Sequence, residues 1–506
     1  MTDKVLLGCV VFASFCACGA TQRYVSKDKS YGADIPNAVL YDKLQDAVKE
    51  AVKGDTIWVK DGFECTTADG TSTDATYGSA VLLLTAESVT IRGETGDWRT
   101  GPVVDGGNTV RCLLCTAKSP TLIGIRFVNG KTSGSDKMAW GGCVDIPLTG
   151  GNVKECFIAN GSANYGGGIN GDSLTTRHCV ISNCTCTVYG NGQRGGNSYD
   201  TLFIKNYGTY GAWQYAKNAD TIVSNCTFVG NSGDGSGSAV SSSSSSGVHS
   251  FYDCRFFDND GSSAGYPPVY GYGKFYNCVF SGNTGYKGGA VASFYDSKAK
   301  KMVPNTIKCY SCVFTNNCDT ICLGAVGYYV EFVNCRIENN GGNDSGTLYG
   351  CRAYNTLIAG NKTKKNGAAI YAVGDSENEY VNCTIVGNEA KNGAVAYAEP
   401  GSTLTLANTI LAKNSATAAD SYTSATTCFF DSDGDPKLVK AGKEFAFWPK
   451  PKSPRVGTGT VLEWMSDETD ARSKDLAGLP RLTDGKVNIG CCEGIAPMPG
   501  LLLLLR

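Results

Sequence analysis

One short phrase recurs along this chain of 506 residues and constrains its fold more than any other feature. A polar residue precedes Cys or Thr, and then come any residue, an apolar residue and, shortly afterwards, Asn, as in residues 155–160 (Glu-Cys-Phe-Ile-Ala-Asn). Repetition at such a period indicates a stack of similar units, each of which buries its apolar side chains against its neighbours. Eleven copies follow one another at intervals of 21 to 34 residues, with the Cys or Thr at Cys156, Cys179, Thr201, Cys226, Cys254, Cys278, Cys312, Cys335, Thr356, Cys383 and Thr409.

A second phrase lies between these copies and consists of small residues closed by a β-branched one, as in residues 288–291 (Gly-Gly-Ala-Val). Two short strand signals per unit, punctuated by Gly and Asn, are typical of a β-solenoid coil rather than a helical hairpin. Stacked coils place equivalent residues about 4.8 Å apart, so that like residues form ladders. We expect the residue two positions after each Cys or Thr to point inward.

The repeated Asn is expected to lie in a turn, because Asn tolerates the left-handed region and its amide can bond along a ladder. The predicted ladder comprises Asn160, Asn183, Asn206, Asn231, Asn259, Asn283, Asn317, Asn340, Asn361, Asn388 and Asn414.

Charge and composition exclude several classes of function. The 45 basic and 47 acidic residues give a net charge of -2, so the chain offers no basic surface for nucleic acid or anionic lipid. The sequence holds two histidines, His178 and His249, which rules out a His-rich metal site and a relay of several histidines. We therefore expect no nucleic-acid partner and no metal site.

The 24 cysteines invite a disulfide, zinc or redox interpretation, and Cys112-x-x-Cys115 and Cys309-x-x-Cys312 have suitable spacing. Eight of the cysteines, however, occupy the repeated phrase. Stacked neighbours lie about 4.8 Å apart, which is longer than the roughly 3.8 Å between Cβ atoms that a disulfide prefers. Most ladder cysteines are therefore expected to be buried thiols that act as small apolar residues.

Both ends of the chain fit a capped stack. Residues 40–52 carry apolar side chains at helical spacing before a strand signal at 56–59, as expected of a short helix that covers the open end. The paired phrases and this entry resemble the right-handed parallel β-helix of the pectate-lyase-like superfamily, and also the Gly-Gly-Ala-Ile and Phe-x-x-Asn motifs of polymorphic outer-membrane proteins. Residues 475–493 resemble the choice-of-anchor Q ending, from which Cys491 and Cys492 depart.

The resemblance implies an all-β fold, a right-handed parallel β-helix solenoid of about twelve coils with a short N-terminal capping helix. The expected organisation is a signal peptide at 1–20, the N-terminal cap and first coils at 21–100, β-helix repeats at 101–420, C-terminal coils and cap at 421–495, and an apolar tail at 496–506. An apolar run at 5–17 behind Lys4 predicts the signal peptide. The alternatives to a signal peptide are a buried N-terminal strand and a lipoprotein signal with its anchor at Cys18. At the other end, the apolar tail is either a vestigial sorting signal or a frayed chain end. We expect no transmembrane span after signal removal.

Two sets of side chains are candidate functional residues. Enzymes of the resembling superfamily use clustered carboxylates with calcium and a basic proton acceptor, which makes a set on one coil the catalytic candidates: Asp253, Arg255, Asp258 and Asp260. Their alternative is a solvated surface. Four tyrosines that follow strand signals are the binding candidates, either stacking on sugar rings or stacking on one another to stiffen the sheet: Tyr270, Tyr349, Tyr371 and Tyr397.

The residue between each Cys and its inward neighbour points outward and is apolar in seven coils, which predicts a cover over this stripe or a partner that binds it. A long loop or the 430–490 tail would supply the cover. The stripe comprises Phe157, Val180, Leu202, Val279, Val313, Leu357 and Ile410.

Together these features predict a secreted or cell-surface protein that acts in adhesion, surface coating or polysaccharide binding, with a polysaccharide or cell-surface partner. The alternative is a polysaccharide lyase or glycoside hydrolase on the same scaffold, and only that alternative would call for a cofactor, calcium. The scarcity of histidine and the near-neutral charge favour a binding rod over an enzyme.

Overall fold

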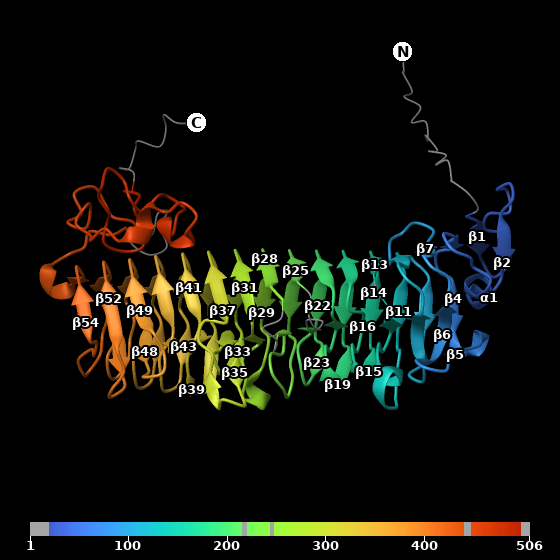
Figure 1. The fold of residues 1–506 in the computed structure, drawn as a ribbon, viewed down its shortest axis with the longest axis horizontal. Coiled ribbons are helices and arrows are strands. Elements are labelled where there is room, and N and C mark those ends of the chain that lie inside the picture. Colours follow the sequence, from blue (N-terminus) through green and yellow to red (C-terminus); the bar gives the residue numbers. More distant parts are fainter. Residues whose placement is uncertain (1–19, 149, 215–219, 243–246, 440–446, 497–506) are drawn as a thin grey trace, which may run out of the picture.

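The computed structural model describes residues 20–148, 150–214, 220–242, 247–439 and 447–496, which form a long rod of stacked coils (Figure 1). Three long parallel sheets of 17, 15 and 14 strands, here named sheets A, B and C, run along the rod. Each coil passes from sheet A to sheet B to sheet C and then to the next coil. The fold is therefore an all-β, right-handed parallel β-helix, as the sequence predicts.

Sheet A contains β1 (Gln22–Val25), β2 (Val39–Tyr41), β3 (Thr56–Val59), β7 (Thr90–Gly93), β10 (Thr121–Ile123), β13 (Gly151–Lys154), β17 (Leu174–Arg177), β21 (Asn197–Tyr199), β25 (Thr221–Ser224), β28 (His249–Tyr252), β31 (Gly273–Tyr276), β37 (Ile307–Tyr310), β41 (Glu331–Val333), β45 (Arg352–Tyr354), β49 (Asn378–Val381), β52 (Leu404–Ala407) and β54 (Ser424–Thr426). Sheet B contains β4 (Glu64–Thr66), β8 (Val103–Asp105), β11 (Arg126–Val128), β14 (Phe157–Ala159), β18 (Val180–Ser182), β22 (Leu202–Ile204), β26 (Thr227–Val229), β29 (Arg255–Phe257), β32 (Val279–Ser281), β38 (Val313–Thr315), β42 (Arg336–Glu338), β46 (Leu357–Ala359), β50 (Thr384–Val386), β53 (Ile410–Ala412) and β55 (Phe429–Phe430).

Sheet C contains β5 (Ser72–Asp74), β6 (Gly78–Leu84), β9 (Arg111–Cys115), β12 (Val144–Asp145), β16 (Ile169–Asn170), β20 (Gln193–Arg194), β24 (Trp213–Gln214), β27 (Val240–Ser242), β30 (Val269–Gly271), β34 (Val291–Ser293), β40 (Gly327–Tyr328), β44 (Leu348–Tyr349), β48 (Ile370–Ala372) and β51 (Ala396–Ala398). Smaller sheets in the turns comprise β15 (Ser162–Tyr165), β19 (Thr185–Tyr189) and β23 (Tyr207–Gly208); β33 (Thr284–Lys287), β39 (Cys318–Leu323), β43 (Gly341–Gly342) and β47 (Lys362–Thr363); and the hairpin of β35 (Tyr295–Asp296) and β36 (Lys301–Met302).

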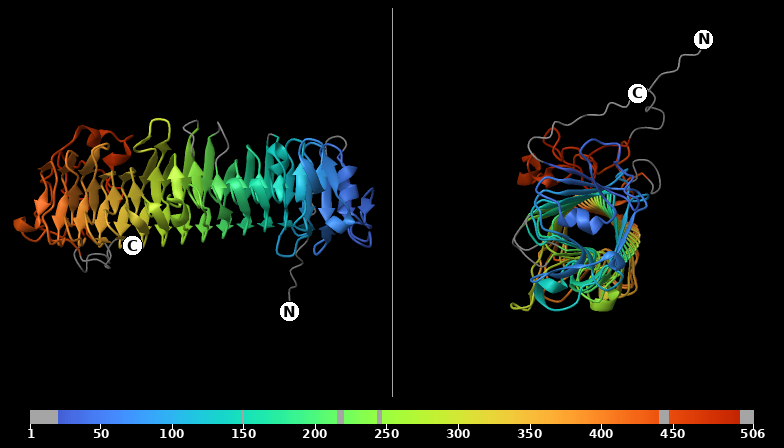
Figure 2. Two further views of the ribbon diagram at one scale, coloured as in Figure 1. Left: turned by 90° about the horizontal axis from the view of Figure 1, so that it is seen from below. Right: turned by 90° about the vertical axis from the view of Figure 1, so that its right-hand side faces the viewer.

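The helices are short. The described chain contains one α-helix, α1 (Leu44–Lys49). It also contains six short 3-10 helices: η1 (Thr67–Asp69), η2 (Asp136–Ala139), η3 (Ser262–Ala264), η4 (Asp431–Asp433), η5 (Glu463–Ser466) and η6 (Ala471–Ser473). Leu44, Ala47 and Val48 of α1 are buried, and the view along the rod shows the helix across the N-terminal end of the tube (Figure 2). It covers the edge that the first coil would otherwise expose, as predicted. No described helix is long and apolar enough to cross a membrane.

The apolar residue two positions after the Cys or Thr points inward, as predicted. In the middle of the rod this position forms a column of stacked phenylalanines, in which the rings of Phe228, Phe256 and Phe280 lie 4.9 Å and 4.6 Å apart and within 6° of parallel. All three rings are fully buried. In-register pairing of β26, β29 and β32 produces the column.

The ladder cysteines are buried thiols, as predicted, and the cysteines whose side chains are described form no disulfide. The Cys254 thiol illustrates their contacts, because it donates to the carbonyl oxygen of Tyr252 at 3.3 Å and lies 3.4 Å from that of Val223 in the preceding coil. Burial raises the pKa of the Cys179 thiol to about 12. These thiols act as small core residues with a weak hydrogen-bond donor.

The predicted Asn ladder is confirmed in part. From Asn206 onward each side chain is bonded to its counterpart in the next coil, and the members are Asn206, Asn231, Asn259, Asn283, Asn317, Asn340, Asn361, Asn388 and Asn414. The left-handed position belongs to the residue before each of these, such as Gly282 (φ 69°). Asn160 (φ 56°) and Asn183 (φ 50°) occupy that turn position instead, so their assignment to the ladder is wrong.

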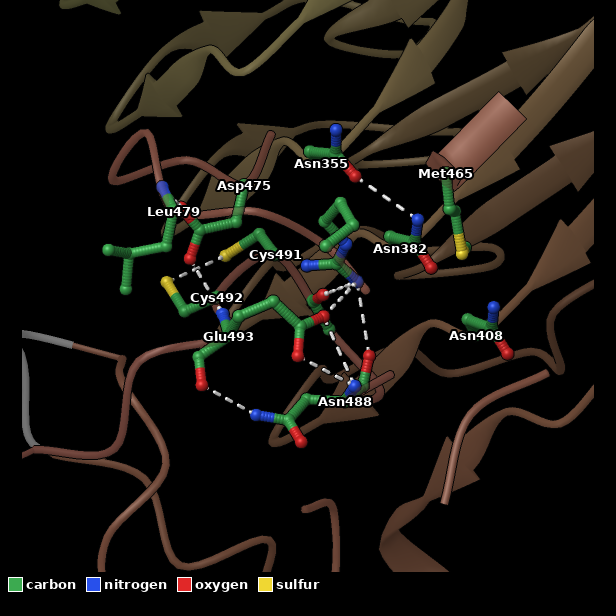
Figure 3. A network of polar contacts seen from close by, with 12 residues as sticks. Asn355, Asn382, Asn408, Met465, Asp475, Leu479, Asn488, Cys491, Cys492 and Glu493 are labelled. Carbon is green, nitrogen blue, oxygen red and sulfur yellow. Dashed lines mark hydrogen bonds and ion pairs between the residues drawn. The ribbon is translucent and has the colours of Figure 1, made fainter. Parts of the chain in front are cut away.

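The C-terminal residues 447–496 fold back as a cap over the last coils (Figure 1). A second Asn row, at the turn from sheet A to sheet B, holds it: Asn355 donates to the carbonyl oxygens of Arg472 (2.8 Å) and Lys474 (2.7 Å), and Asn408 donates to that of Thr460 (2.8 Å). Inside the cap, the Asn488 main chain and amide bond to Glu493 (Figure 3).

The predicted cover over the apolar stripe exists at its C-terminal end. Leu357 and Ile410 are fully buried in a cluster with Ile489, Cys491 and Cys492 of the cap. The other members of the stripe are half-buried: Phe157, Val180, Leu202, Val279 and Val313. The predicted signal peptide lies outside the described residues except for Ala20, and so does residue 497 onward of the predicted tail.

Candidate functional site

The four predicted catalytic residues are exposed and lie at separate parts of one coil. Asp253 (φ 54°) is the left-handed residue between β28 and β29, and Asp258 (φ 52°) is the left-handed residue that precedes ladder Asn259. Arg255 points outward from β29, and Asp260 accepts a hydrogen bond from the Ser262 amide. Other coils most often fill the two turn positions with Asn or Gly, which explains both aspartates as turn formers.

The structure does not bring these side chains together, because the four share no ion pair or hydrogen bond with one another in the described chain. Within the described ranges, no three His, Cys, Asp or Glu side chains lie close enough to hold a metal ion. The described residues therefore show no carboxylate cluster of the kind that the lyase alternative expects around calcium, and the catalytic role of this set stays a prediction.

The four predicted binding tyrosines lie in one outward row of sheet C. Tyr349 and Tyr371 are in register with rings 4.8 Å apart, and Tyr371 pairs with Tyr397 at 5.2 Å. Tyr270 belongs to the same row and lies two coils before Tyr328. Tyr328 is a member of the row that the sequence did not predict. Tyr349, Tyr371 and Tyr397 are half-buried and contact one another along the row, as the stiffening alternative expects. Tyr270 is buried and packs against Tyr266 and Phe294 instead.

A second outward face, that of sheet A, carries a charged row. Lys274, Lys308, Glu331 and Arg352 follow one another in register on β31, β37, β41 and β45. Alternate residues of a strand point away from the core, so all four stand on the outer surface. No sequence motif predicts this row, because its four residues come from four different coils.

Glu331 is the centre of this row. Its side chain is only 8% exposed and lies 3.2 Å from the Lys308 ammonium, while it accepts a hydrogen bond from the Arg352 Nε at 2.7 Å. Arg352 also donates to Glu377 at 2.6 Å. Burial lowers the pKa of Arg352, but the Glu331 charge outweighs it and holds that pKa above its usual value. The network is thus a fixed, partly desolvated set of charges.

Beside the charges lies an aromatic platform formed by the other outward row of sheet A. The rings of Tyr252, Tyr276 and Tyr310 stack at 4.9 Å and 5.0 Å, within 11° of parallel. Tyr252 is 37% exposed, and the other two are half-buried. Burial and the Glu331 charge raise the pKa of Tyr310, so its hydroxyl stays protonated and can donate a hydrogen bond.

Loops and the cap turn this face into a groove. Two hollows of about 690 Å³ and 790 Å³ share Lys308 and Arg352 as lining residues. One wall comes from the cap at 468–474, and the other from residues 304–305 and the loop 374–377. Arg472 of the cap lies 5.0 Å from the Tyr354 ring and is ion-paired to Asp470 at 2.6 Å. The groove therefore combines aromatic faces with hydrogen-bonding charges, as sites for polar ring-shaped ligands do.

Comparison with known proteins identifies no family for this chain. No family model matches this sequence, and no curated protein matches it. Solved structures that share the β-helix include a mannuronan C-5 epimerase A-module from Azotobacter vinelandii (13% identity, 76% of this chain and 93% of the module, TM-score 0.34). Others are an α-1,3-glucanase catalytic unit from Streptomyces thermodiastaticus (12%, 81% and 70%, 0.34) and the pectate lyase Pel9A (9%, 94% and 97%, 0.23). These neighbours are carbohydrate-active enzymes, and at such identities the likeness concerns the fold alone.

Proposed function

We propose that this protein is an exported or cell-surface rod that binds a polysaccharide chain in the groove on the outer face of sheet A. The observation that carries the proposal is the stacked platform of Tyr252, Tyr276 and Tyr310 directly beside Glu331, whose carboxylate is held between two cations. Sugar rings offer an apolar C–H face for such a platform and hydroxyls for such charges.

The spacing of the platform favours a polymer over a small ligand. Each coil advances the rod by about 4.8 Å, which is close to the advance of one sugar residue in an extended polysaccharide. The tyrosine rings repeat at 4.9 Å and 5.0 Å along the rod. Successive sugars can therefore meet equivalent aromatic positions, which a monosaccharide would not need.

The charged network is suited to fixing the orientation of that chain. Glu331 accepts and Lys308 and Arg352 donate, and all three are held in place by one another before a ligand arrives. Preorganised polar groups cost less entropy on binding than mobile ones do. A carboxylate-bearing sugar would find two cations here, and a neutral sugar would find both donors and an acceptor.

Affinity electrophoresis against a panel of polygalacturonate, alginate and a neutral α-glucan tests the proposal. We expect Tyr276→Ala to weaken retention by about fivefold, which corresponds to the loss of an aromatic contact worth about 1 kcal/mol. Tyr207→Ala is the matched control, because Tyr207 is 51% exposed and lies outside the groove. Retention that is equal in the two variants, or absent for every polysaccharide, would contradict the proposal.

Cleavage of the bound polysaccharide is a second candidate function, favoured by one observation. Glu331 and Glu377 both bond to Arg352, which places two carboxylates in the same groove. Hydrolysis of glycosidic bonds uses two such groups. New reducing ends that Glu331→Gln abolishes would support a hydrolase, and new unsaturated ends would support a lyase. Loss of cleavage in Asp258→Asn or Asp260→Asn, with Glu331→Gln unaffected, would move the active site to the other face.

A further inference from the structure

We propose a second, separate binding site for an acidic oligosaccharide in a cleft on the outer side of sheet C. The cleft has a volume of about 720 Å³ and lies over β30, β34 and β40. The hairpin of β35 and β36 forms part of its wall. This hairpin belongs to the longest coil of the repeat series, where 34 residues separate Cys278 from Cys312. The proposal does not require the groove on sheet A to bind anything.

Tyrosine rings dominate the lining of the cleft. Tyr266 packs edge-on against Tyr270 with ring centroids 4.8 Å apart, and Tyr328 packs edge-on against Tyr329 at the same distance. Tyr295 on the hairpin is 39% exposed and completes the opposite side. Edge-on pairs fix the rings in place, so the cleft offers rigid apolar faces with hydroxyl groups at their rims.

An aromatic track leads away from the cleft along the rod. Tyr328, Tyr349, Tyr371 and Tyr397 stand in register on four successive coils. The first two rings stack at 5.1 Å and the next pair at 4.8 Å. The lining of the cleft thus continues as a surface with one ring per coil, which suits a chain of sugars longer than the cleft itself.

The charges at the cleft select an acidic ligand. Three cations line it, Lys287, Lys300 and Lys301, and none of them forms an ion pair within the described residues. Asp375 is the carboxylate of the lining, and it already accepts a hydrogen bond from the Tyr329 hydroxyl at 2.5 Å. Asp296 of the hairpin accepts hydrogen bonds from the main-chain amides of Lys298 and Ala299, which stabilises the hairpin turn. The lysines are therefore the charges left for a ligand.

The loop 374–377 stands between this cleft and the groove on sheet A, and its Asp375 lines both. Its Asp375 bonds to Tyr329 on the side of the cleft, whereas its Glu377 bonds to Arg352 on the side of the groove. Substitutions on the hairpin consequently leave the groove residues untouched. This arrangement makes the two sites separable by mutation.

Calorimetric titration with oligogalacturonate tests the proposal on the full chain. We expect the double variant Lys300→Glu/Lys301→Glu to weaken one class of site at least tenfold, whereas Lys298→Glu, on the same hairpin but outside the lining, leaves it unchanged. Both lysines of the double variant are exposed, so the fold should persist, and circular dichroism checks this. Tyr295→Ala should weaken the same class.

Three results would overturn the proposal. The first is a titration that the hairpin double variant does not alter, and the second is equally tight binding of a neutral oligosaccharide to the hairpin-sensitive class. The third is sedimentation as a dimer that the double variant dissociates, because the cleft would then hold a second copy of the chain. Binding in the groove is measured separately, as a class of site that Tyr276→Ala removes. If that class never appears while the hairpin-sensitive class remains, the groove has failed and the cleft has not.

Discussion

Replacing one Asn in the middle of the buried ladder should destabilise the rod strongly. The amide nitrogen of Asn283 donates to the Phe256 carbonyl oxygen and to Asn317 Oδ1, both at 2.9 Å. Its Oδ1 accepts from the Asn259 main-chain amide at 3.1 Å and from the Asn259 side chain at 3.0 Å. Asn283→Ala removes all four bonds in a site that is fully buried.

The expected cost follows from those four bonds. At about 1 kcal/mol for each net hydrogen bond, the loss is about 4 kcal/mol, and the orphaned buried groups add to it. Water cannot replace the missing partners at a site without solvent exposure. Because a solenoid unfolds by nearest-neighbour units, the loss should appear first as local opening of the coils on either side.

Hydrogen exchange followed by mass spectrometry measures that opening directly. We expect amides of β29, β32 and β38 to exchange about a thousandfold faster in Asn283→Ala, which corresponds to about 4 kcal/mol. Asn183→Ala is the control, because Asn183 belongs to the same sequence phrase but lies exposed at a left-handed turn position. Alanine in that conformation costs about 1–2 kcal/mol. If the two variants exchange equally, the ladder does not carry the stability that its geometry implies.

Two further predictions concern the cap and the thiols. Burial outweighs the nearby Arg481 and raises the pKa of Glu493 from 4.5 to about 7, so its contribution to cap stability is present at low pH and is lost as the pH rises through 7. Urea unfolding followed by tryptophan fluorescence should show a cap weakened by about 2.5 kcal/mol between pH 5 and pH 8, and Glu493→Gln should remove this dependence; a cap that gains stability with pH would contradict it. Among the described cysteines whose burial is assigned, Cys318 and Cys428 alone are not fully buried, so native alkylation read by mass spectrometry should modify them before any ladder thiol; earlier labelling of Cys254 would contradict this.

The repeat phrase was sufficient to predict the fold, because period and phase are properties of the sequence. It failed at Asn160 and Asn183, where four residues instead of five separate the Cys from the Asn. That one-residue difference moves the Asn from the buried ladder slot to the left-handed turn before it. Asp258 occupies this same turn position, and Asp253 occupies the left-handed position between β28 and β29. The two looked like a chemical cluster because their structural role is invisible without backbone angles.

The groove was not predictable from local pattern. Lys308, Glu331 and Arg352 are separated by 23 and 21 residues and share no motif, and only the in-register pairing of β37, β41 and β45 makes them neighbours. The tyrosines of sheet C were predicted because each follows a recognisable strand signal, whereas those of sheet A stand two positions before the Cys, outside the phrase that defined the repeat. A search for the residue two positions before each Cys would have shown the sheet A row.

Both proposed sites lie where the regularity of the solenoid is interrupted. A uniform stack offers smooth ladders on every face, and a hollow needs walls that the repeat itself does not supply. The cap supplies one wall of the groove, the loop 374–377 stands between groove and cleft, and the hairpin in the 34-residue coil supplies a wall of the cleft. The interval between successive copies of the Cys phrase can be read from the sequence. An unusually long interval therefore indicates a coil that carries a candidate site. The ladders then have a distinct task, which is to hold these three irregular elements at fixed spacing along one rod.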